Sequence, residues 1–145
     1  MKLGADEAEA SAARRKETVG EARLRGIGHG YVRFALAHPG HFRVMFRPEL
    51  KRQLNAGESV TIVEAFDILQ RAVARCQEEG TIPAGDPRRI VLLAWASVHG
   101  ASALWLDGPL PEEGLVDDAR ALETAVADTL MELLRGRDAA PRRRS

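Results

Sequence analysis

The sequence predicts an all-α fold of about five to seven helices in one domain. Apolar residues recur every three or four positions, no segment alternates as a β-strand does, and proline and glycine separate the periodic segments. Of the 145 residues, 45% are hydrophobic and 29% are charged, as in ordinary globular proteins. We expect a flexible lead-in at 1–17, a globular domain at 18–135 and a disordered tail at 136–145.

Helices are predicted on both sides of His38-Pro39, because the residue before proline is pushed out of the helical region and proline is favoured at the start of a new helix. The first helix spans about 19–37, and its apolar face carries Leu24, Ile27, Tyr31 and Phe34. Its three glycines, at 26, 28 and 30, each cost about 1 kcal/mol relative to alanine in a helix interior, so we expect either close packing at these positions or a later start of the helix. Two short pieces follow, one with Phe42, Met45 and Phe46, and one with Leu50 and Leu54 that ends near Gly57.

The middle of the chain predicts two longer helices. The first carries Ile62, Phe66, Leu69, Val73 and Cys76, with a capping box at Thr61-x-x-Glu64 and a stop at Gly80. The second starts at Asp86-Pro87, where aspartate caps and proline takes the first position, and ends at Asp107-Gly108-Pro109. Its apolar run over 90–106 is shorter than the roughly 20 residues of a membrane span. We therefore expect a buried central helix and no membrane association.

A final helix is predicted up to Gly136, with apolar positions spaced by four and three, as in helices packed nearly parallel or antiparallel. These positions are Leu115, Ala119, Leu122, Val126, Thr129 and Leu133. Leu130, Met131 and Leu134 widen the apolar stripe, so this helix should contact both its own core and a partner.

Composition excludes several classes of protein and site. Lys plus Arg and Asp plus Glu are 21 each, which argues against the basic excess of a nucleic-acid-binding domain. The single cysteine, Cys76, excludes an internal disulfide and a multi-cysteine metal site. The first twenty residues contain no apolar stretch of a secretory signal. We expect a cytoplasmic protein without a metal or cofactor.

His99, within the apolar helix, is the strongest candidate for a functional polar side chain. It is either a satisfied core histidine or the polar group of an otherwise apolar ligand pocket. Ser97 and Ser102 lie close to it in sequence, but no acid lies nearby to orient the imidazole, so we do not expect an enzyme. The glycines at 26–30 lack the third glycine and the preceding strand of a dinucleotide loop, and His38 and His41 have no carboxylate at metal-ligand spacing.

Two segments carry a resemblance to a known family. GYVRFALAHPGHFRVMFRPEL at 30–50 and AWASVHGASALWLDGPL at 94–110 resemble the C-terminal regulatory domain of TetR/AcrR-type transcriptional regulators, WHG subgroup. The resemblance implies a domain that dimerises through its last two helices as a four-helix bundle and that holds an inducer pocket. It also implies that DNA is bound only through an N-terminal helix-turn-helix domain, for which the 18 residues before Val19 are too few.

On this resemblance we expect the ligand-sensing and dimerisation domain of a transcriptional regulator. Repression by the regulator would be relieved when this domain binds a small apolar inducer. The alternative is a stand-alone helical protein that forms mixed dimers with a full-length regulator. The expected ligand-binding residues are Tyr31, Phe34, Phe42, Met45, Phe66, Trp95 and His99. The expected homodimer interface consists of Ala96, Gly100, Ala103, Leu115, Ala119, Leu122, Val126, Thr129 and Leu133.

Overall fold

The computed structural model describes residues 16–45 and 56–136, with side chains in these ranges except at 56–63. The described residues form six helices and no strand, which confirms the predicted all-α fold. The helices are α2 (Val19–Ala37), α3 (Pro39–Met45), α5 (Ala56–Glu78), α6 (Pro87–Leu106), α7 (Leu110–Glu113) and α8 (Ala119–Arg135). The expected lead-in and tail, and the short piece around Leu50 and Leu54, lie mostly outside the described residues.

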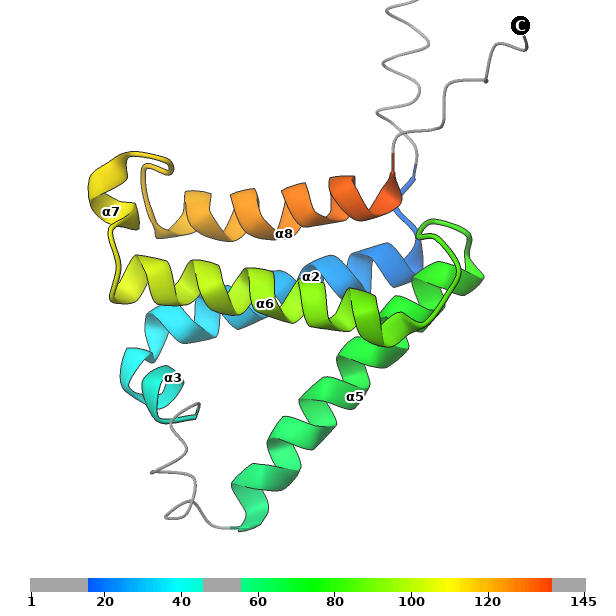
Figure 1. The fold of residues 1–145 in the computed structure, drawn as a ribbon, viewed down its shortest axis with the longest axis horizontal. Helices are drawn as coiled ribbons and strands as arrows, with labels where there is room; N and C mark the ends of the chain where they lie inside the picture. The colour runs from blue at the N-terminus through cyan, green and yellow to red at the C-terminus, as the bar shows by residue number, and fades with distance from the viewer. Residues whose placement is uncertain (1–15, 46–55, 137–145) are drawn as a thin grey trace, which may run out of the picture.

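Helices α2, α6 and α8 pack against one another along their lengths, and α5 crosses them at an angle and diverges toward its N-terminal end (Figure 1). Two clusters of buried side chains hold the bundle together. One joins α2, α5, α6 and α8 around Leu24, Val73, Val91 and Met131, and the other lies around Val32, Val98 and Leu122. The packing of α2, α5, α6 and α8 creates the walls of the site described below.

Most predicted helix ends are confirmed by their hydrogen bonds. The Asp86 carboxylate accepts from the Arg88 backbone N–H at 3.0 Å, with Pro87 at the first helical position of α6. Gly80 has a φ of +74°, a conformation that glycine adopts without steric cost, and Thr81 N–H donates to the Cys76 carbonyl at 3.0 Å. These ends depend on local chemistry, which is why they could be predicted.

Two predicted helix starts are wrong. Helix α5 begins at Ala56, so Gly57 lies inside it and Thr61-x-x-Glu64 does not cap its start. Extending an existing helix gains a hydrogen bond for each residue ordered, and this outweighs a local capping signal. Helix α8 begins at Ala119 with Asp118 as its cap, because the left-handed Gly114 ends α7 and places Leu115 in the connecting turn.

Polar side chains also join α2 to α8. The guanidinium of Arg135 donates to both carboxylate oxygens of the buried Glu21, at 3.1 and 2.9 Å. Further along, the two ring nitrogens of His29 lie 2.8 Å from Glu123 and 3.0 Å from Asp128. The register between the two helices is therefore fixed by directional bonds as well as by apolar contacts.

Helix α6 is buried along one face only, at Val91, Ala94, Val98 and Ser102. Leu92, Leu93 and Leu104 on its other faces are exposed, so the prediction of a buried helix is wrong for those faces. By length and composition α6 also passes as a membrane span, but a helix of a soluble protein passes the same test and this is weak support for one.

Candidate functional site

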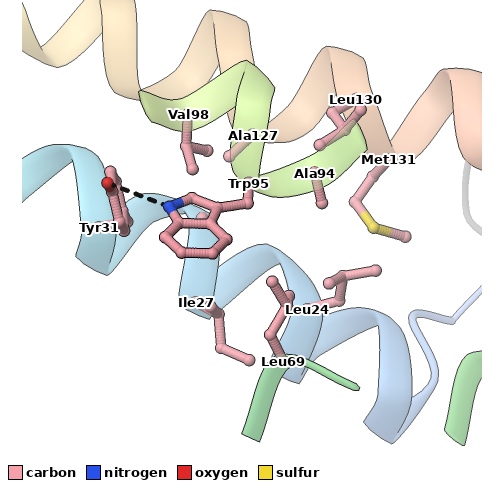
Figure 2. A pocket seen from close by; sticks show the side chains of 11 residues that line it. Leu24, Ile27, Tyr31, Leu69, Ala94, Trp95, Val98, Ala127, Leu130 and Met131 are labelled. Carbon is pink, nitrogen blue, oxygen red and sulfur yellow. Dashed lines mark hydrogen bonds between the residues drawn. The ribbon is translucent and has the colours of Figure 1, made fainter. Parts of the chain in front are cut away.

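An apolar cavity of about 50 Å³ lies where α2, α5, α6 and α8 meet. Figure 2 shows Trp95 extending from α6 across this space, with side chains of α2 and Leu69 of α5 on one side and side chains of α8 on the other. The lining residues are Leu24, Ile27, Gly28, Tyr31, Leu69, Ala94, Trp95, Val98, Ala127, Leu130 and Met131. The cavity offers apolar contact on nearly every side and has room for a few water molecules at most.

Three polar groups form a chain at one end of this cavity. The indole N–H of Trp95 donates to the Tyr31 hydroxyl oxygen at 3.3 Å, and the Tyr31 hydroxyl lies 2.8 Å from Nδ1 of His99 (Figure 2 shows the first bond). Burial lowers the pKa of His99, which favours the neutral imidazole and leaves Nδ1 free to accept from Tyr31. Burial raises the pKa of Tyr31, partly offset by the bond from Trp95, so the phenol keeps its proton.

A second, shallow depression of about 200 Å³ lies on the exposed side of α6 and is lined by Leu92, Trp95, Ala96 and His99. Trp95 lines both this depression and the inner cavity. The Trp95 side chain therefore borders both spaces.

Comparison of the chain with known protein families identifies its family. The family model described as "Tetracyclin repressor-like, C-terminal domain" matches residues 24–136. The chain belongs to this family. A search of curated proteins and a search of solved structures found no match. The family confirms the resemblance drawn from the sequence: the chain contains the C-terminal domain of a TetR-like transcription regulator.

The TetR-like domain brings some of the expected ligand residues together. Tyr31 and Trp95 line the cavity, and His99 joins it through Tyr31. Phe42 is buried with its ring centroid 5.0 Å from that of His99, and the Phe66 ring centroid lies 5.1 Å from that of Trp95. These two rings pack behind the polar chain and do not line the cavity.

Phe34 and Met45 do not reach this site. Phe34 is 43% exposed and its nearest ring partner is His38, with centroids 5.1 Å apart. Met45 is half-buried at the last position of α3. The face of α2 that packs inward is turned toward Val32 and Ala35, so Phe34 falls outside it.

The side chains from α8 that line the cavity were not expected as ligand residues. They are Ala127, Leu130 and Met131. The signal for them was the widened apolar stripe of the last helix, which indicates burial on more than one face but does not say which neighbour lies there.

The expected interface residues separate into three groups by exposure. Ala96, Leu115, Ala119, Thr129 and Leu133 are exposed, Gly100, Ala103 and Val126 are half-buried, and Leu122 is buried. Leu122 packs with Val32 and Val98 inside the chain. A charge placed there would disrupt the core, so Leu122 is unsuited to test association.

The two serines near His99 in the sequence bond to the backbone of their own helix. The hydroxyls of Ser97 and Ser102 donate to carbonyls of their own helix, at Leu93 and Val98, each at 2.7 Å. Within the ranges that the structure describes, no group of three or more histidine, cysteine, aspartate or glutamate side chains is placed to hold a metal ion.

Proposed function

We propose that this TetR-like domain holds a cytoplasmic transcription regulator in a homodimer and senses a small apolar ligand that relieves repression. The observation that carries the proposal is the set of large exposed leucines on α6 and α8, the two helices that would form the interface. Leu92 is 68% exposed and Leu133 is 74% exposed, although both belong to helices that pack in the bundle.

The exposed leucines suit a helix-to-helix interface. Large apolar side chains grouped on one surface of a soluble protein commonly mark a contact site. Ala96 on α6 is small and exposed, and Gly100 is half-buried one turn later, which lets a second helix approach the backbone closely. Two copies of α6 and α8 facing one another would cover these side chains in a four-helix bundle.

The ligand would enter at Trp95. Pockets for small molecules usually measure about 300–1,000 Å³, well above the 50 Å³ of the closed cavity. Turning the indole aside would join the cavity to the depression of about 200 Å³ on the outer side of α6. Because that depression is also lined by Leu92 and Ala96, ligand entry and association of two copies would act on the same face of α6.

This shared face gives a physical basis for regulation. A ligand changes the balance between two arrangements only when it binds one of them more tightly. A ligand that displaces Trp95 would favour the arrangement of α6 that accommodates the displaced ring. The dimer contacts would transmit this change to the DNA-binding domains of the regulator.

Charged variants on the exposed leucines test the dimer. We expect Leu92→Glu and Leu133→Glu to lower the mass in solution from that of a dimer toward 15.8 kDa, because each buries a charge at the contact. Val19→Glu, at an exposed apolar residue on α2, is the matched control and should leave the mass unchanged. A mass that is the same for all three variants and the unmodified chain would refute the proposed interface, provided that circular dichroism shows intact helices.

A further inference from the structure

A groove of about 490 Å³ lies between α2 and α5, and the proposed function does not use it. It is lined by Arg23, Gly26, Ile27, Ile68, Arg71 and Ala72. Its volume falls within the usual range for small-molecule sites, about 300–1,000 Å³, whereas the inner cavity does not.

The groove combines apolar walls with positive charge. Ile68 is 53% exposed at its edge, and Ala72 is buried at its base. Arg23 makes no ion pair or hydrogen bond with any residue in the described ranges 16–45 and 56–136. Arg71 pairs with Asp67 one turn away on α5, but both side chains are more than half exposed, and such pairs are weak.

Gly26 leaves the wall of the groove open on the α2 side. A Cβ placed on Gly26 would meet no atom within 4 Å, so no neighbour in the described structure requires glycine there. Glycine inside a helix costs about 1 kcal/mol relative to alanine. An occupant that lies against the α2 backbone would supply a reason for this cost.

From this combination we propose that the groove between α2 and α5 binds an organic anion with an apolar body, such as an aromatic carboxylate. The carboxylate would accept hydrogen bonds from the Arg23 and Arg71 guanidinium groups, and a planar guanidinium suits a carboxylate because it donates two parallel bonds. The ring would lie over Ile27 and Ala72 beside Ile68. This groove borders the inner cavity at Ile27, but its arginines and Ile68 do not line that cavity.

The test is calorimetric titration of the full 145-residue chain with 1-naphthoate and with the neutral analogue 1-naphthylmethanol. We expect naphthoate to bind at least about tenfold more tightly, because hydrogen bonds to a charged carboxylate are stronger than those to a neutral hydroxyl. Arg23→Ala should weaken naphthoate binding by about tenfold. Gly26→Leu should abolish it by filling the groove.

Two controls separate this site from other surfaces and from the proposed function. Arg89→Ala removes an exposed arginine on α6, and Ala94→Leu fills the inner cavity, so neither should change naphthoate binding. Gly26→Ala, which adds only one methyl group, reports whether the helix tolerates a side chain at this position.

Equal binding of the acid and the alcohol would overturn the proposal, and so would unchanged naphthoate binding in Arg23→Ala and Gly26→Leu. Loss of binding in Ala94→Leu alone would also overturn it, because the ligand would then occupy the inner cavity. The mass measurements on the leucine variants do not depend on any of these results.

Discussion

The hydroxyl of Tyr31 on α2 lies 2.8 Å from Nδ1 of His99 on α6, and the Trp95 indole donates to the same hydroxyl. This bond joins two helices at the one polar end of an apolar cavity. The imidazole is half-buried, lies beside the inner cavity and lines the outer depression together with Trp95.

Tyr31→Phe should lower the free energy of unfolding by about 1 kcal/mol, the usual contribution of one hydrogen bond. It should also shift the emission of Trp95, whose indole donates to this hydroxyl. Both effects are measurable by chemical denaturation in a Trp105→Phe background, where Trp95 is the remaining tryptophan. Unchanged stability and unchanged emission would mean that the bond contributes nothing.

Acidification should destabilise the domain through His99. Because burial lowers its pKa in the folded state below 6.5, the unfolded chain binds more protons as the pH falls through that value. The stabilisation is therefore present at neutral pH and is lost toward lower pH. His99→Gln should show a smaller loss of stability between about pH 7.5 and 5.5 than the unmodified chain. Equal losses would contradict a lowered pKa.

Replacing single glycines of α2 by alanine should show which of them lie against another helix and which do not. A Cβ at Gly28 would lie 3.2 Å from the Cβ of Ala127 on α8, whereas one at Gly26 or Gly30 would meet nothing within 4 Å. We expect Gly26→Ala and Gly30→Ala to raise the free energy of unfolding by about 0.5–1 kcal/mol each. Gly28→Ala should raise the free energy of unfolding by less, or should lower it, and thermal unfolding of the three variants measures the difference. A gain at Gly28 as large as at Gly26 would refute the close approach of α2 and α8.

Glu123→Ala should lower the free energy of unfolding by about 1–3 kcal/mol. Burial raises the pKa of this carboxyl, but hydrogen bonds from Arg33 and His29 outweigh burial and lower the pKa overall. The carboxylate therefore stabilises the contact between α2 and α8 above its unfolded pKa, and this contribution is lost at more acidic pH. Glu132→Ala, at an exposed position on the same helix, is the control and should change stability by less than about 0.5 kcal/mol.

The sequence predicted features that depend on neighbouring residues and missed those that depend on distant ones. Asp86-Pro87, Gly80 and His38-Pro39 mark helix ends through local backbone chemistry, and the structure confirms all three. Phe34 fits the apolar period of α2, but which face turns inward is decided by contacts with α5, α6 and α8. Sequence spacing does not contain those contacts.

The candidate site shows the same division. Tyr31 and Trp95 were expected in the pocket and lie in its wall. Leu130 and Met131 were expected only as additional apolar positions of the last helix. The approach of α8 to α2 that brings them to the cavity depends on Gly28 and on the bonds of Glu123. These contacts join residues about a hundred positions apart, so sequence spacing does not reveal them. Periodicity identifies the apolar faces of a helix but not the neighbour of each face.

The measurement that tests the proposed dimer most directly is the mass of the unmodified chain, determined by sedimentation equilibrium over a range of concentrations. We expect about 31.6 kDa, twice the 15.8 kDa of one chain, because the exposed leucines of α6 and α8 are covered when two copies associate. A mass of 15.8 kDa at every concentration would contradict the proposed dimer and leave these leucines in contact with water.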